Sequence, residues 1–348
     1  LAPCAYEMGA PDRPGYVVFT SGSSGRPTPV LHAHRAIWAR GMMHRHWEGL
    51  TPADRMLHAG AFNWTYTLGT GLMDPWTLGA TALIPAAGVV AAQLPLLLKR
   101  FDATILAAAP GVIRQILQAP LPPLPRLRHG LSAGESLLPA LRQQWQTATG
   151  TDLHEALGMS ECSTYVSGSP DRPAPLGTLG FVQPGRQIAL RNGELAVHRS
   201  DPGLMLGYLD DPDATAARFD GDWFLTGDLA EETPEGALRM LGRRDDRMNP
   251  GGFRVAPQEV EAALHGLPGA AEWAVAEVAV KPGVTVIGCF FTAPSDAPPV
   301  QIERLSAFAA ERLARYKQPR IWQQVDRLPR TGTGKLNRRA LAPLWTPT

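Results

Sequence analysis

The chain has 348 residues, more than a single hydrophobic core usually holds, so two domains are expected. Its 33 basic and 32 acidic residues give a formal net charge of +1, which argues against the broad basic surface of a nucleic-acid-binding protein. The three cysteines lie far apart without a C-x-x-C spacing, so neither a disulfide framework nor a zinc site is expected and a reducing cytosol is favoured. The longest apolar run, near Leu94–Leu98, is too short to span a bilayer, and no membrane partner is predicted.

The first half of the chain alternates strand-like and helix-like segments. Such alternation is typical of a mainly parallel sheet with helices on its faces. The predicted strands are Tyr16–Thr20, Ala80–Ile84, Ala103–Ala108 and Leu127–Ala133. The predicted helices are His34–Trp47, Ala91–Arg100, Val112–Gln118 and Leu138–Gly150.

After Pro175 the pattern changes to short strands separated by Gly, Pro and Asp turns, which indicates a β-rich subdomain. A charged stretch, Gly242–Arg247, separates this part from a final unit whose pattern predicts a small α+β domain. The strands predicted in the β-rich part are Gln187–Leu190, Gly193–His198, Trp223–Leu225 and Leu238–Leu241. The final unit has predicted helices at Pro257–His265 and Val300–Tyr316 and predicted strands at Trp273–Val280 and Ile287–Thr292.

A Gly- and Ser-rich loop from Thr20 to Pro27 follows the first predicted strand and precedes the first predicted helix. Glycines let backbone N–H groups approach an anion and the hydroxyls add donors, so the loop predicts a phosphate site; a plain surface linker is the alternative. No Gly-Lys-Ser/Thr ends it, so it is not a Walker loop. Near the C-terminus, two glycines and two threonines precede Lys335. Its ammonium group can neutralise charge that develops in acyl transfer, and a solvated basic tail is the alternative.

Two carboxylates are predicted at the ends of strands. Glu161 follows an apolar strand through the turn Leu157–Ser160, and Asp228 closes the run Trp223–Gly227. Carboxylates at strand ends beside glycines suit a metal ion or a ribose. Each one alone is more often a turn residue or a helix cap.

In this order, and together with Gly242-Arg243-Arg244-Asp245-Asp246, these elements resemble the acyl-adenylate-forming superfamily, which includes the acyl-CoA synthetases, the adenylation domains of peptide synthetases, and luciferase. The resemblance is closest to the acyl-CoA synthetase and aryl acid–CoA ligase branch. It implies an α/β fold with a large AMP-binding domain at 1–243, divided near 175 into an α/β part and a β-rich part. A hinge at 244–246 and a small mobile α+β lid domain at 247–348 follow. Because only 19 residues precede Thr20, it also implies that an N-terminal part of the usual large domain is missing.

The resemblance also implies the roles of individual residues. Ser160 matches the hydroxyl that contacts the α-phosphate, Glu161 the magnesium carboxylate, and Lys335 the catalytic lysine. Asp228 and Arg243 match the ribose binders. The other residues that match ATP- and AMP-binding positions are Thr20, Ser21, Gly22, Ser23, Ser24 and Gly25 of the phosphate loop, Gly134 and Glu135 along the adenine, and Leu157 and Gly158 beside it.

Three residues fall where family members line the acid pocket: Phe62, Asn63 and Trp64. Aromatic rings there restrict depth and favour a small acid, aromatic or short-chain, although core packing is the alternative for the rings. The resemblance makes Asp245 the hinge residue, with Gly252 near a pantetheine tunnel and Arg254 in the same motif.

The implied co-substrates are ATP with Mg²⁺, a carboxylic acid and a thiol. Asn249 stands where peptide-synthetase domains more often carry lysine, which favours coenzyme A over a carrier-protein phosphopantetheine as the acceptor. Thr28 stands where the phosphate loop usually has lysine, which puts tight binding of the β- and γ-phosphates in doubt. A non-catalytic adenylate-binding relative is therefore the alternative from another functional class.

Overall fold

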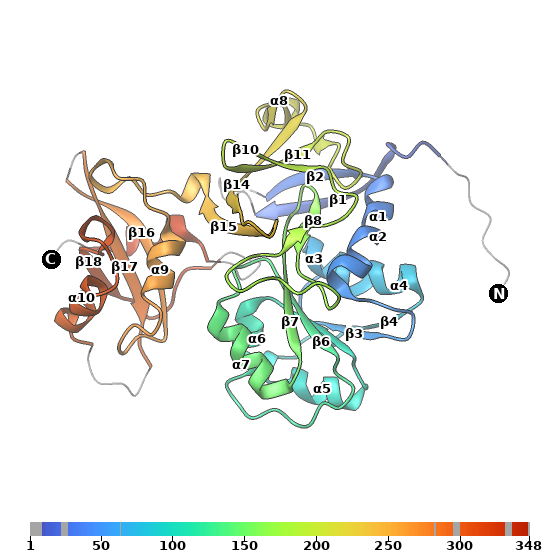
Figure 1. Cartoon of the computed structure of the whole chain (residues 1–348), viewed down its shortest axis with the longest axis horizontal. Coiled ribbons are helices and arrows are strands. Elements are labelled where there is room, and N and C mark those ends of the chain that lie inside the picture. Colours follow the sequence, from blue (N-terminus) through green and yellow to red (C-terminus); the bar gives the residue numbers. More distant parts are fainter. Residues whose placement is uncertain are drawn as a thin grey trace. The chain divides into compact units, whose positions relative to one another are not determined.

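The computed structural model describes residues 9–21, 27–62, 64–281, 283–294, 300–330 and 336–346. The chain divides into two compact units (Figure 1). The first comprises Leu1–Thr226 and Glu232–Arg239, and the second Gly227–Glu231 and Met240–Thr348. Within the described ranges, no helix combines the length and the apolar character needed to cross a membrane. The domain bounds implied by the family resemblance stay a prediction.

A seven-stranded sheet in the order β4-β3-β5-β6-β7-β8-β9 forms the centre of the first unit. Neighbouring strands from β4 to β7 are parallel, whereas β8 and β9 are antiparallel to their neighbours. The mainly parallel sheet expected from the alternating pattern is thus confirmed. The strands are β3 (Arg55–His58), β4 (Thr81–Leu83), β5 (Ile105–Ala107), β6 (His129–Ala133), β7 (Asp152–Met159), β8 (Ser163–Ser167) and β9 (Phe181–Val182).

Both faces of this sheet are buried under helices. Met56 of β3 and Ile105 of β5 belong to one core cluster, whereas the next residues, Leu57 and Leu106, belong to the other. Successive side chains of a strand point to opposite faces, so strands covered on both sides read as continuous apolar runs. The helical segments of this unit are α1 (Arg35–Ala39), α2 (Gly41–Met43), the π-helix η1 (His44–Glu48), α3 (Thr65–Leu68), the π-helix η2 (Gly69–Met73), α4 (Asp74–Leu78), η3 (Ala91–Gln93), α5 (Leu94–Arg100), α6 (Pro110–Ile116) and α7 (Pro139–Thr149).

A separate three-stranded sheet carries the segments on either side of the predicted phosphate loop. Its order is β1 (Pro14–Ser21), β2 (Pro27–Ala33) and β12 (Gly207–Tyr208), and both pairings are antiparallel. Thr20 lies opposite Thr28, so loop residues 22–26, which lie outside the described ranges, connect two strands of a hairpin. The loop precedes the first helical segment as predicted, but strand β2, which was not predicted, lies between them. Pro27 and Pro29 disfavour helical backbone in the residue before each, which leaves this segment extended.

The β-rich part contains β10 (Ile188–Arg191), β11 (Glu194–His198), β13 (Phe219–Asp220), β14 (Trp223–Glu232) and β15 (Leu238–Arg243), with α8 at Pro212–Ala216. The strand order is β10-β11-β14-β13, and β15 pairs with β14. The predicted short strands are confirmed, with one correction. Asp228 lies inside β14 and not at its end, because the strand continues to Glu232.

The second unit is built on a three-stranded sheet, as the predicted α+β pattern requires. Its strands β16 (Glu272–Lys281), β17 (Val284–Thr292) and β18 (Ile321–Gln324) lie in that order, the first pair antiparallel and the second parallel. Helices α9 (Pro257–Ala263) and α10 (Ile302–Ala310) contribute Val260 and Leu305 to its core. The helix predicted over 300–316 is thus shorter than expected. Single 3-10 turns complete the unit: η4 (Arg244–Asp246), η5 (Pro250–Gly252), η6 (Arg315–Lys317), η7 (Arg338–Ala340) and η8 (Ala342–Leu344).

Candidate active site

Three of the predicted site segments follow parallel strands of the central sheet. The acid-pocket segment follows β3, Gly134 and Glu135 follow β6, and Ser160 and Glu161 follow β7. Parallel strands end at the same edge of a sheet, and open α/β sheets bind ligands outside this carboxyl edge. The fold therefore brings these segments to one edge of the first unit, with β6 and β7 as direct neighbours.

The turn after β7 is anchored to the three-stranded sheet by a buried histidine. His32 of β2 is 1% exposed, and its Nε2 lies 2.7 Å from the carbonyl oxygen of Ser160. Burial lowers the pKa of His32 to about 4, so its ring is neutral at neutral pH. Because the partner is a carbonyl, the ring donates this bond and Nε2 carries the hydrogen. No motif in the sequence marks His32 as a functional residue.

Glu161 is held at both its backbone and its side chain. It is 7% exposed, and its carbonyl oxygen accepts a 2.8 Å hydrogen bond from the backbone N–H of Met205. The hydroxyl of Tyr208 in β12 donates to Glu161 Oε1 at 2.9 Å. The carboxylate predicted to bind magnesium is thus tied to the strand that pairs with β2.

The residues after Glu161 are fixed by two buried arginines. Arg186 donates to the carbonyl oxygen of Cys162 at 2.9 Å while paired with buried Asp201, also at 2.9 Å. Arg40 Nη1 donates to the hydroxyl of Ser163 at 2.6 Å. A turn with this many anchors keeps its side chains in fixed directions, which a binding site requires.

Gly158 and Leu157 lie where β7 meets β8 with an irregular register. A Cβ added to Gly158 would lie 2.6 Å from the backbone oxygen of Ser163, so no side chain fits without moving the backbone. Leu157, predicted beside the adenine, is half-buried. Gly158 is therefore required by the close approach of the two strands that frame the turn.

A buried acid holds the backbone just after the predicted adenine segment. Gly134 has a φ of 96°, which lets the chain turn as β6 ends, and Glu135 beside it is half-buried. Just after Glu135, the backbone N–H of Leu137 donates to Glu155 Oε1 at 2.8 Å. Burial raises the pKa of Glu155 to about 7. No motif marks Glu155. Its position inside an apolar strand is the only feature of the sequence that could have indicated a functional role.

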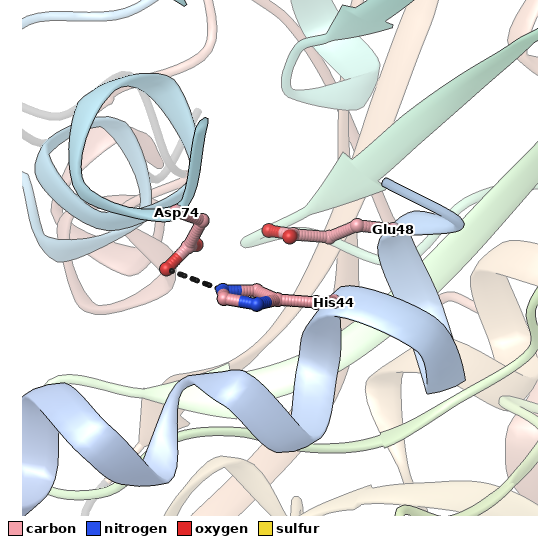
Figure 2. A group of neighbouring side chains, drawn as sticks. All are labelled: His44, Glu48 and Asp74. Atoms are coloured by element: carbon pink, nitrogen blue, oxygen red, sulfur yellow. Dashed lines mark ion pairs between the residues drawn. The ribbon is translucent and has the colours of Figure 1, made fainter. Parts of the chain in front are cut away.

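A second buried polar cluster lies on the helices beside the site. Figure 2 shows the side chains of His44 and Glu48 leaving one helical segment and pointing toward Asp74. Ligand-type atoms of the three lie within 4.8 Å of one another. Arg40, however, donates to both oxygens of Asp74, Nε to Oδ1 at 2.7 Å and Nη2 to Oδ2 at 2.5 Å. A guanidinium thus already occupies the side of Asp74 where a metal would need space.

Charge in this cluster is balanced without a metal. Burial, helped by the charge of Asp74, raises the pKa of Glu48 well above its ordinary value. Burial acts in the same direction on Asp74, but Arg40 outweighs it and the pKa of that carboxyl is low. We therefore interpret the cluster as the buried Arg40–Asp74 ion pair with a neutral Glu48 beside it.

The predicted acid-pocket residues lie in the segment between β3 and α3. Phe62 is 39% exposed, Trp64 is half-buried, and Asn63 lies outside the described ranges. Trp64 packs edge-on against Tyr66 at 5.2 Å, and the Tyr66 hydroxyl donates to the carbonyl oxygen of Leu131 at 3.2 Å. Tyr66 is therefore a core residue, while Phe62 and Trp64 stay candidates for the pocket.

The remaining predicted residues lie beside the loop or in the second unit. Thr20 and Ser21 end β1 next to loop residues 22–26. In the second unit, Arg243 Nη1 donates to Asp228 Oδ1 at 2.8 Å, so the two predicted ribose binders form an ion pair. Asp245 lies exposed on η4, and Gly252 and Arg254 are exposed in the turn between the bridged residues 248 and 255. Lys335 lies outside the described ranges, which resume at Leu336, bridged to Arg330.

Comparison with known proteins decides the family. The model of the AMP-binding enzyme family matches residues 2–209, and that of the AMP-binding enzyme C-terminal domain matches residues 259–335. The chain belongs to the AMP-binding enzyme family. Its fold is accordingly the α/β adenylate-forming fold with an N-terminal AMP-binding part and a C-terminal domain, as the motif order predicted.

The relatives include enzymes named for acyl and aryl acids. The human mitochondrial acyl-coenzyme A synthetase ACSM2A is 30% identical over 93% of this chain and 60% of its own length. The 3-hydroxybenzoate–CoA/4-hydroxybenzoate–CoA ligase of Thauera aromatica is 29% identical over 97% of this chain and 68% of its own. The crystal structure of the anthranilate CoA ligase AuaEII with anthranoyl-AMP has a TM-score of 0.87 at 26% identity, over 98% of this chain and 69% of that one. The chain thus spans about 60% to 70% of the length of these relatives.

Proposed function

We propose that this protein uses ATP to convert a small carboxylic acid into an acyl-adenylate and then transfers the acyl group to the thiol of coenzyme A. The observation that carries the proposal is the anchored Ser160–Glu161 turn, placed beside the Gly134–Glu135 segment at the carboxyl edge of the sheet. Membership of the AMP-binding enzyme family and a relative's structure with anthranoyl-AMP support it.

In the first proposed step, a carboxylate oxygen of the acid attacks the α-phosphorus of ATP and the bond to pyrophosphate breaks. Lys335 neutralises negative charge on the acid and the α-phosphate, and the Ser160 hydroxyl donates to an α-phosphate oxygen. Asp228 accepts from the ribose hydroxyls, with Arg243 holding its carboxylate. In the second step a thiol attacks the acyl carbon and AMP leaves.

Glu161 on the turn fits the magnesium ion that the family implies. Glu161 offers a nearly buried carboxylate, and Mg²⁺ prefers oxygen ligands, commonly one or two carboxylates together with substrate phosphates. When bound, the ion would neutralise charge on the phosphates of ATP. The Tyr208 hydroxyl, which donates to Glu161 Oε1 at 2.9 Å, limits the orientations of that carboxylate.

For the acid we favour an aromatic substrate. Phe62 and Trp64 supply rings in the segment that follows β3, and relatives are named for hydroxybenzoate and anthranilate. For the acceptor we favour coenzyme A, because Asn249 stands where peptide-synthetase domains more often carry lysine. Asn249 is exposed and its backbone N–H donates to Glu277 Oε2 at 3.0 Å, so it sits in a structured turn.

The test is pyrophosphate release from ATP over a panel of aromatic and short-chain acids, with and without coenzyme A. Lys335→Ala is expected to lower acid-dependent ATP–pyrophosphate exchange by roughly 100-fold or more, because a preorganised charge is lost. Lys281→Ala, at the exposed end of β16, is the matched control and is expected to keep wild-type exchange. Exchange by Lys335→Ala at the wild-type rate would contradict the role given to Lys335.

One observation favours a second candidate, a non-catalytic adenylate-binding protein. Thr28, the second residue of β2, replaces the lysine that usually follows the phosphate loop. The same panel separates the two functions. Binding of ATP by calorimetry without pyrophosphate release for any acid would favour the non-catalytic protein, and transfer only to a phosphopantetheinylated carrier protein would replace coenzyme A as the acceptor.

A further inference from the structure

Tyr208 is the side chain that connects Glu161 to the sheet carrying the phosphate loop. Its hydroxyl donates to Glu161 Oε1 at 2.9 Å across 47 residues of sequence. It lies on β12 opposite Val30 of β2, and β2 begins at Pro27, directly after loop residues 22–26. One three-stranded sheet therefore holds both the base of the loop and the donor to the carboxylate.

The backbone of Tyr208 has little freedom to move. Its own N–H donates to Thr215 Oγ1 at 2.8 Å. Two nearby residues also bond to β2. The N–H of Leu206 donates to the carbonyl oxygen of Leu31 at 2.8 Å, and that of Leu209 donates to the carbonyl oxygen of Pro29 at 2.9 Å. The sheet thus fixes the backbone from which the Tyr208 side chain reaches Glu161.

We propose that Tyr208 is a positioning residue that orients the carboxylate of Glu161 for the magnesium–ATP complex. This inference rests on the proposed function. A glutamate carboxylate turns about its side-chain bonds, and holding it in one orientation removes an entropic cost that the ion would otherwise have to overcome. Partners that hydrogen-bond a ligating carboxylate typically change metal affinity or activity by about 10- to 100-fold when they are removed.

The same hydrogen bond also has an effect that opposes magnesium binding. A phenol that donates to a carboxylate withdraws charge from it, so loss of the hydroxyl leaves a more strongly charged oxygen for the ion. If that electrostatic effect dominated, removal of the hydroxyl would tighten magnesium binding. The anchored backbone of Tyr208 and the second bond to Glu161, from Met205 to its carbonyl, favour orientation as the dominant effect.

The experiment measures ATP binding by calorimetry at a series of Mg²⁺ concentrations. Tyr208→Phe keeps the ring and removes only the hydroxyl. We expect about 10-fold or more Mg²⁺ to be needed for half-maximal ATP binding, with binding in EDTA unchanged. Tyr316→Phe removes a hydroxyl from a 43% exposed ring in the second unit and is the matched control, expected to bind as wild type.

A double-mutant cycle tests whether Tyr208 acts through Glu161. In the Glu161→Gln background the Mg²⁺ dependence should no longer respond to Tyr208→Phe, because the oriented carboxylate is gone. An equal loss in both backgrounds, unchanged binding, or tighter binding by Tyr208→Phe would overturn the inference. Failure of the wild-type protein to bind magnesium–ATP would instead overturn the proposed function, so the two failures are distinguishable.

Discussion

Replacing Glu155 by glutamine should change how the stability of the protein depends on pH. Glu155 is 6% exposed on β7, where it accepts the backbone N–H of Leu137 and lies 3.7 Å from Arg142. Burial raises its pKa from 4.5 to about 7, against the opposing effects of Leu137 and Arg142. Glutamine keeps an oxygen that can accept from Leu137 and removes the titration.

The sign follows from which state holds the proton more tightly. With its raised pKa, the folded chain binds the Glu155 proton more tightly than the unfolded chain does. The contribution to stability is complete below about pH 4.5 and is lost as the pH rises toward about 7. Integrating between pH 5 and pH 8 gives a loss of about 2 to 3 kcal/mol in the free energy of unfolding from this one group.

Urea unfolding followed by far-UV circular dichroism at pH 5, 6, 7 and 8 measures this loss. The quantity to compare is the difference between Glu155→Gln and wild type, because groups common to both chains cancel. We expect this difference to move in favour of the variant by about 2 to 3 kcal/mol over the range. Asp152→Asn, at an exposed position of the same strand, is the control and should show no such trend. A constant difference for Glu155→Gln would refute the reasoning.

Two further substitutions test the framework of the site by urea unfolding. Gly158→Ala should destabilise the first unit by about 1 to 3 kcal/mol, because the added Cβ would lie 2.6 Å from a backbone oxygen. The control is Gly111→Ala in α6, which has open space around it and should be neutral or slightly stabilising. Asp74→Asn should lower the free energy of unfolding by about 3 to 5 kcal/mol, because Arg40 is left buried without its charged partner. Glu48→Gln should lower it much less, because Glu48 is neutral. Equal losses in either pair would contradict the corresponding interpretation.

Local signals in the sequence were sufficient for strands β4, β5 and β6 of the central sheet and for the order of the motifs, whereas β3, β8 and β9 were not predicted. β5 and β6 are apolar runs bounded by turns, and α7 is bounded by Pro139 and Gly150, so residues close in sequence determine them. Glu161 was predicted after an apolar strand, and it follows β7. The family followed from the same motif order and is confirmed by the comparison.

Contacts between distant residues were decided only by the tertiary structure. β2 was missed because a segment with Pro27 and Pro29 resembles a loop until β1 and β12 pair with it. The donor from Tyr208 to Glu161 joins residues 47 positions apart, and nothing near either one in the sequence indicates the other. Motif order and spacing, which are local, were enough to predict the family. The neutral His32, the raised pKa of Glu155 and the orientation of Glu161 depend on burial and on long-range hydrogen bonds, which exist only once the chain has folded.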